Sequence, residues 1–185
     1  CNNIYSYAGS FGPFTLEQIN DKNLISYVNG GLELFKKLSV RDKNSFEIIK
    51  SISGIDSEIV CDPVILYGFS HEQEMNSVKL PKRKYLLIYA YDNNMNSTEE
   101  VKNILDYAKK KELITVSVGF YHKWCDKCVD GDPIDILGYF KYAKYVVTDT
   151  FHGSVMSLIT NANFVAKIRG NKNKLYDLLT RFNLT

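Results

Sequence analysis

The stretch YVVTDTFHGSVMSLI, residues 145–159, decides the fold. Its first residues, Tyr145–Thr148, form a short apolar run of β-prone side chains, and from Gly153 onward the apolar side chains recur at helical spacing. The segment TDTFHG, residues 148–153, joins the two patterns without a spacer. A buried strand that passes directly into a helix is typical of α/β proteins, in which ligands bind beyond the carboxyl ends of the strands.

The same pattern recurs through the C-terminal half of the chain. Three further apolar runs predict buried strands: Tyr85–Tyr91, Ile114–Phe120 and Phe164–Ile168. Helical patterns lie between the strands and begin at cap signals, Ser97 with Glu100 and Asp132 before Pro133. This alternation predicts an α/β fold of the Rossmann-like kind, with a parallel sheet, right-handed crossovers and helices on both faces.

The pattern divides the chain into two α/β parts. Residues 84–185 carry the regular alternation and are expected to form a Rossmann-like C-terminal domain. Residues 1–67 show a less regular version, and we expect them to be the C-terminal part of a first lobe, because the chain opens directly in a strand pattern. Residues 68–83 are polar and lack periodicity, which predicts a linker.

Composition excludes several classes of partner. The 185 residues, 45% of them hydrophobic, suffice for one sizeable core or two smaller ones. A net charge of +2 from 23 basic and 21 acidic side chains provides no broad field for nucleic acid. No apolar run approaches the roughly 20 residues that cross a bilayer, and four cysteines are too few for a disulfide scaffold. We therefore expect a soluble, cytoplasmic protein.

Residues in the TDTFHG segment are able to handle an anion and a proton. Asp149 or Thr150 can cap the following helix, and Gly153 lets a ligand approach the backbone closely. His152 can exchange protons near neutral pH. The segment by itself is equally well explained as a capped tight turn with a half-buried histidine, so both interpretations stay open at this point.

Taken with three other segments, this stretch resembles the polysaccharide pyruvyltransferase family, in which a strand ends in a T-[DS]-[ST]-F-H-G turn before a helix. The other segments agree in order: YAGSFG at residues 7–12, SVRD at 39–42 and CDPVIL at 61–66. DILGYFKYAKYVVTDTFHG, residues 135–153, also follows the family's order of helix and strand. The likeness spans nearly the whole chain, and its specificity lies in the combination.

The resemblance implies a fold and a reaction. The fold would be a two-lobed, GT-B-like arrangement with the site between two Rossmann-like halves, the N-terminal one incomplete here. The reaction would move the enolpyruvyl unit of phosphoenolpyruvate onto two sugar hydroxyls, forming a cyclic ketal and releasing phosphate. Phosphoenolpyruvate would be the donor, without a further cofactor or metal, and a sugar or a lipid- or nucleotide-linked glycan the acceptor. Peripheral association with bacterial glycan-assembly machinery, as in exopolysaccharide synthesis, is expected as well.

The resemblance also implies roles for particular residues. His152 matches the family's motif histidine and would do acid–base work or bind the donor, and Arg41 matches an arginine whose planar fork suits an anion. The implied substrate-binding residues are Asp149, Thr150, Gly153, Ser154, Lys174, Ser10 and Gly12. Lys174 stands where many relatives have arginine, and keeps the charge without the fork. Without the family, Arg41 could equally pair with Asp42; Asp62 is expected only to shape the exit of a strand.

The segment WCDKC, residues 124–128, suggests a different chemistry, the WCxxC motif of thiol-disulfide oxidoreductases. In those proteins the first cysteine begins a helix, which lowers its pKa, whereas VDGDP at 129–133 interrupts the chain here. Zinc would need four ligands, and only His122 is close. We therefore expect a surface loop, with His122 solvated and Cys61 buried. Two further alternatives keep the fold: a GT-B glycosyltransferase that uses a nucleotide sugar, and a non-catalytic glycan-binding fragment.

Overall fold

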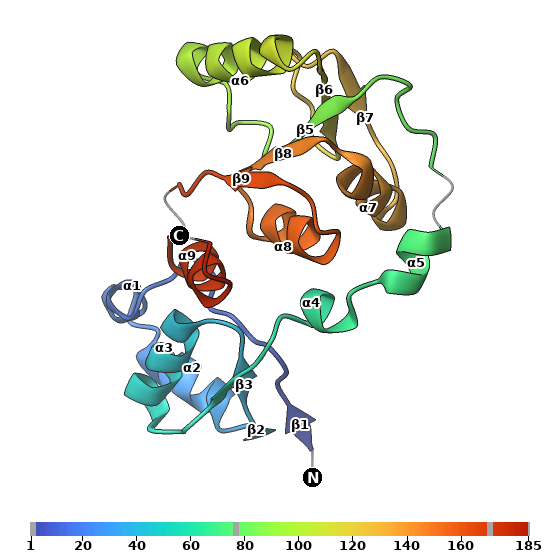
Figure 1. The fold of residues 1–185 in the computed structure, drawn as a ribbon. Coiled ribbons are helices and arrows are strands. Elements are labelled where there is room, and N and C mark those ends of the chain that lie inside the picture. The colour runs from blue at the N-terminus through green and yellow to red at the C-terminus, as the bar shows by residue number, and fades with distance from the viewer. Residues whose placement is uncertain (1–2, 76–77, 170–171, 185) are drawn as a thin grey trace. The chain divides into compact units, whose positions relative to one another are not determined.

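The chain forms two compact units in a computed structural model that describes residues 3–75, 78–169 and 172–184 (Figure 1). The first unit consists of residues 1–66 and 168–185, and the second of residues 67–167. The expected linker, 68–83, begins next to this division. The last helix, which we expected with the C-terminal domain, groups with the first unit.

The second unit is built on a five-stranded sheet in which every pairing is parallel, in the order β7-β6-β5-β8-β9. The strands are β5 (Tyr85–Tyr89), β6 (Ile114–Val118), β7 (Lys127–Val129), β8 (Tyr145–Thr148) and β9 (Phe164–Ala166). The predicted α/β class with a parallel sheet is thereby confirmed, and the long apolar runs β5 and β6 lie in its centre. Such runs are expected where a strand is covered on both faces.

Helices cover both faces of this sheet (Figure 1). Helix α6 (Thr98–Lys110) packs on one face, where Leu86 and Ile88 form an apolar cluster with Ala108. Helices α7 (Pro133–Tyr142) and α8 (Phe151–Ile159) pack on the other face, where Phe140 meets Leu87. The alternation of side chains along one strand thus supplies two separate cores.

Strand β7 corrects a prediction, because the WCDKC segment was expected to be a surface loop. Asp126 Oδ2 accepts hydrogen bonds from the backbone N–H and the hydroxyl of Thr115, at 2.8 and 3.0 Å, and its own N–H donates to Thr115 Oγ1. This double contact fixes the segment beside β6, so that Val116 pairs with Lys127. The strand is only three residues long and lacks an apolar run, which is why its sequence gives no strand signal.

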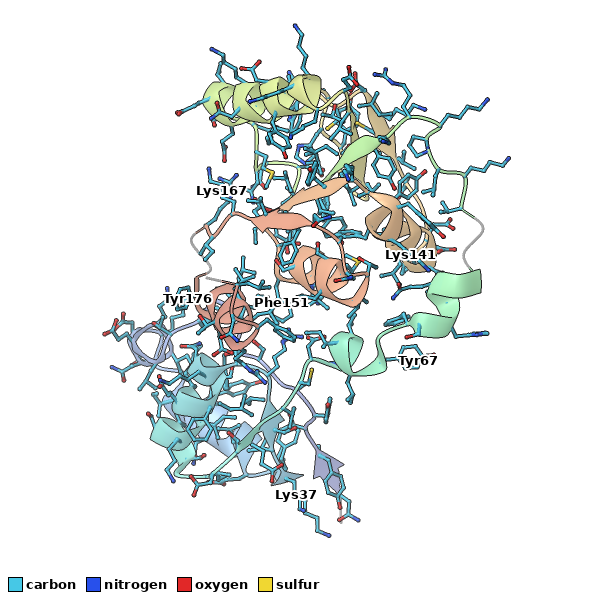
Figure 2. The ribbon with its side chains drawn as sticks, viewed as in Figure 1. Lys37, Tyr67, Lys141, Phe151, Lys167 and Tyr176 are labelled. Atoms are coloured by element: carbon cyan, nitrogen blue, oxygen red, sulfur yellow. The ribbon has the colours of Figure 1, made fainter. Side chains whose placement is uncertain are left out.

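Helix α5 (Ser70–Met75) falls within the segment predicted to be a linker, 68–83. The ammonium group of Lys141, on α7, donates to the backbone carbonyl of Gln73 at 3.1 Å (Figure 2). The side-chain amide of Gln73 donates in turn to the carbonyl of Ile159 at 3.2 Å. A polar composition is therefore compatible with an ordered segment, because the contacts that hold it use polar groups.

The described residues of the first unit form two short parallel strand pairs and several helices. The strands are β1 (Ile4–Tyr5), β2 (Phe35–Lys37), β3 (Ser39–Val40) and β4 (Glu58–Ile59), with β1 on β2 and β3 on β4. The helices are α1 (Leu16–Asp21), α2 (Ile25–Leu32), α3 (Lys43–Ser53) and α9 (Lys172–Arg181); α4 (Pro63–Tyr67) lies at the division of the units. Leu32, Leu38, Val40 and Ile49 form the core. Among the described residues, no helix is both long and apolar enough to span a membrane.

Removing the Phe140 side chain tests the core of the second unit. This ring is fully buried, so Phe140→Ala should lower the free energy of unfolding by about 3–5 kcal/mol through lost burial and a new cavity. Tyr142→Ala, on the same helix but with the tyrosine 54% exposed, should change it by less than about 1 kcal/mol. Urea denaturation followed by circular dichroism measures both, and equal losses would contradict this packing.

Candidate active site

The turn from β8 into α8 is organised by two threonine hydroxyls. The hydroxyl of Thr148 donates to the carbonyl of Tyr89, on the neighbouring strand β5, at 2.7 Å, and accepts the N–H of Thr150 at 3.1 Å. The hydroxyl of Thr150 accepts the N–H of Gly153 at 2.8 Å, which makes Thr150 the N-cap of α8. Thr148 is completely buried, so the strand end and the start of the helix are locked together.

Gly153 is required by this packing. A Cβ atom at that position would lie 2.1 Å from Thr148 Oγ1 and 2.8 Å from Thr150 Oγ1. The hydroxyl of the buried Ser154 donates to the carbonyl of Thr150 at 3.2 Å. The observed contacts of Gly153 and Ser154 are therefore internal to the turn, and their expected contacts with a substrate stay predictions.

His152 is exposed, in contrast to the residues around it. It stands in the first turn of α8, between the buried residues Phe151 and Gly153; Figure 2 labels Phe151 at this end of the helix. The Phe151 ring meets the imidazole edge to face, at 5.5 Å between centroids. Asp149, just before the cap, is buried. The turn thus presents an imidazole, a proton-exchanging group, on a rigid base.

The first unit contains the second group of candidate residues, centred on Arg41. This arginine follows β3, and its Nη1 lies 2.8 Å from Oδ2 of Asp62, a buried carboxylate. The other carboxylate oxygen of Asp62 accepts the N–H of Val64 at 2.9 Å. Asp62 was expected only to shape the exit of a strand, and sequence reasoning missed its contact with the candidate residue Arg41. The sequence contains one hint of this contact, because Asp62 lies shortly after β4, the strand that pairs with β3.

Asp42 does not pair with Arg41; its carboxylate holds the loop containing Ser10 instead. It caps α3 by accepting the N–H of Ser45 at 2.8 Å, and it accepts the hydroxyl of Ser10 at 2.7 Å. Ser10 Oγ in turn accepts the N–H of Gly12 at 3.0 Å. Gly12 has φ +64°, a conformation that favours glycine. The SFG turn is therefore joined to the residue that follows Arg41.

Lys174, near the start of α9, lies in the same neighbourhood. Partial burial and the positive charge of Arg41 lower the pKa of Lys174, and the carboxylates of Asp42 and Asp62 oppose that shift. Because the folded pKa is below the unfolded one, the ammonium charge opposes folding at neutral pH, and this penalty disappears only as the pH rises through the pKa window of Lys174. The charges of Arg41 and Lys174 are therefore close enough to interact, in a group that also contains the carboxylates of Asp42 and Asp62.

The predicted site residues thus fall into two groups. Ser10, Gly12, Arg41 and Lys174 lie together in the first unit, with Asp42 and Asp62 as supporting carboxylates. Asp149, Thr150, His152, Gly153 and Ser154 lie together in the second unit, at the end of β8. Among the described residues, no group of three or more histidine, cysteine, aspartate or glutamate side chains is arranged to hold a metal ion.

Cys125, in the WCDKC segment, is unsuited to thiol exchange. Burial, together with the neighbouring Cys128, raises the pKa of the Cys125 thiol to about 12, whereas a reactive cysteine has a lowered pKa. His122, which we expected to be solvated, is only 1% exposed, with Nε2 3.0 Å from the carbonyl of Ala90. The expectation of a solvated histidine was therefore wrong. Cys61, expected to be buried, is half-buried.

A protein-family model matches most of the chain. The family model described as "Polysaccharide pyruvyl transferase" matches residues 1–169 of the 185. The match includes the segments with Arg41 and His152 and ends before α9 and Lys174. The chain belongs to the polysaccharide pyruvyl transferase family. No curated protein matches it significantly.

Adding a methyl group to Gly153 tests the geometry of the turn. Gly153→Ala should destabilise the protein by about 1–3 kcal/mol, because the new Cβ would overlap two buried hydroxyls. Gly30→Ala is the matched control: it lies in α2, and no atom lies within 4 Å of its added Cβ. The control should be neutral or slightly stabilising. If thermal denaturation shows equal effects for the two variants, the described turn is incorrect.

Proposed function

We propose that this chain transfers the pyruvyl group of phosphoenolpyruvate to two hydroxyls of a sugar, forming a cyclic ketal in the synthesis of a bacterial cell-surface glycan. The family match over residues 1–169 is the observation that carries this proposal. The two groups of candidate residues support it, because one offers cations for an anionic donor and the other offers an exposed imidazole.

In this proposal, Arg41 and Lys174 bind the donor. In phosphoenolpyruvate, the carboxylate is bonded to the central carbon and the phosphoryl group to the oxygen on that same carbon. Two adjacent cations therefore match its charges. Asp62 holds the guanidinium of Arg41 through one nitrogen, 2.8 Å away. The cost of charging Lys174 in the folded chain would be recovered when an anion binds beside it.

His152 moves the protons. The reaction requires a proton at the methylene carbon of the donor, attack of one sugar hydroxyl on the neighbouring carbon, release of phosphate and attack of the second hydroxyl. One hydroxyl proton is retained in the new methyl group, and the other leaves with the phosphate, so the reaction needs no oxidant, reductant or further cofactor. An exposed imidazole on the first turn of a helix is suited to delivering and accepting these protons.

The proposal includes the GT-B-like, two-lobed arrangement that the family resemblance implies. It also includes a cytoplasmic site of action, next to glycan-assembly machinery at the membrane. The three cysteines that the structure describes are all free thiols, which is typical of a reducing compartment.

Turnover by a histidine variant tests the proposal. His152→Ala should lower the rate of phosphate release from phosphoenolpyruvate, in the presence of an acceptor glycan, by about 10²- to 10⁴-fold, because the proton-transfer group is lost. The side chain is exposed, so the variant should keep its melting temperature. His71→Ala removes another exposed histidine, on α5, and should retain full activity. Wild-type turnover by His152→Ala would contradict the assignment.

A further inference from the structure

The second unit has a cavity of about 370 Å³ at the carboxyl ends of β5, β6 and β7, within the range of about 300–1,000 Å³ found for small-molecule sites. Asp92, after β5, lines it together with Phe120 and Tyr121, after β6, and Asp130, after β7. We call it the tyrosine cavity. In parallel sheets, ligands bind at this end of the strands, and the active-site assignment above uses none of these four residues.

Two aromatic residues, Phe120 and Tyr121, line the tyrosine cavity. The ring of Phe120 contacts those of Tyr89 and Tyr91 edge to face, with centroids 5.1 and 5.4 Å away. Beside it, Tyr91 is 53% exposed and Tyr121 is 68% exposed. The backbone N–H of Tyr121 donates to Asp92 Oδ1 at 2.7 Å, which fixes the loop after β6. Rigid, exposed aromatic rings offer an apolar face with a polar edge, the surface that a sugar ring packs against.

The charged groups of the cavity are carboxylates. Asp92 and Asp130 are the charged side chains that line it among the described residues, and both are exposed. Ionised carboxylates only accept hydrogen bonds, so they match the hydroxyl donors of a sugar and repel phosphates and carboxylates. Among the described residues, the lining of the cavity therefore lacks cations such as Arg41 and Lys174, which lie in the first unit.

The tyrosine cavity lies at the same edge of the sheet as the His152 turn. Strand β5 lies between β6 and β8. Tyr89, the last residue of β5, is in register with Thr148, the last residue of β8, and accepts its hydroxyl. Asp92 and Tyr121 also line a neighbouring, larger cavity of about 970 Å³. A ligand longer than one sugar ring can therefore continue past Tyr121.

We propose that the tyrosine cavity binds an uncharged hexopyranose residue of the acceptor glycan, with its ring against Tyr121 and its hydroxyls donating to Asp92 and Asp130. The role as acceptor site rests on the proposed function, whereas sugar binding itself does not. In this proposal, the acceptor site and the proton-transfer histidine both lie in the second unit, at the edge of one sheet.

Saturation-transfer NMR on the full chain tests this assignment, with the methyl glycosides of glucose, galactose and mannose at millimolar concentration. At least one should receive saturation, and Tyr121→Ala and Asp130→Asn should each weaken its binding about tenfold. Tyr142→Ala is the matched control, because it removes a tyrosine of similar exposure from α7, and should leave binding unchanged. Methyl glucuronide, which carries a carboxylate, should bind more weakly than the methyl glucoside.

Absence of binding by all three glycosides would overturn the proposal, as would unchanged binding by Tyr121→Ala or equal binding of the glucuronide. Two further outcomes distinguish failure of the proposed function from failure of the sugar site. Sugar binding without phosphate release from phosphoenolpyruvate would overturn pyruvyl transfer and keep the sugar site. Phosphate release with an unchanged acceptor KM in Tyr121→Ala would keep pyruvyl transfer and overturn the role of the tyrosine cavity as the acceptor site.

Discussion

The hydroxyl of Thr148 is the contact on which the organisation of the second unit depends. It donates to the carbonyl at the end of β5, at 2.7 Å, and accepts the backbone N–H of Thr150, so one buried group joins two strand ends to the start of a helix. The position of Gly153 follows from it, because no side chain fits against that hydroxyl. The exposed position of His152 follows as well. Packing thus explains the residues of the TDTFHG segment, and their chemistry stays a proposal.

Charge separates the two halves of the proposed reaction. In the first unit, Arg41 and Lys174 share a neighbourhood in which the positive charge of one lowers the pKa of the other. In the second unit, the tyrosine cavity has carboxylates and aromatic rings. Electrostatic attraction and repulsion would therefore direct an anionic donor to the first unit and an uncharged acceptor to the second, before the shape of either site matters. In this proposal, the carboxylates of the tyrosine cavity would also repel the released phosphate.

Strong local signals made most of the fold predictable. The apolar runs of β5, β6 and β8 and the caps Ser97 and Asp132 depend on neighbouring residues in sequence and were identified correctly. Thr150, the cap of α8, was one of two candidates, with Asp149. Strand β7 and the burial of His122 depend on long-range contacts, with Thr115 and with Ala90, that have no local signal. The roles of the motif residues stay predictions. The contact between Asp62 and Arg41, 21 residues apart, has no local signal and was not predicted.

Calorimetric measurement of phosphoenolpyruvate binding tests the central claim most directly, when wild-type chain is compared with Lys174→Met. The charge of Lys174 opposes folding at neutral pH, so the variant should be at least as stable as the wild type. Losing one of two cations should nevertheless weaken binding of the donor about tenfold or more. A variant that binds phosphoenolpyruvate as tightly as the wild type, or a wild-type chain that does not bind it, would contradict the account.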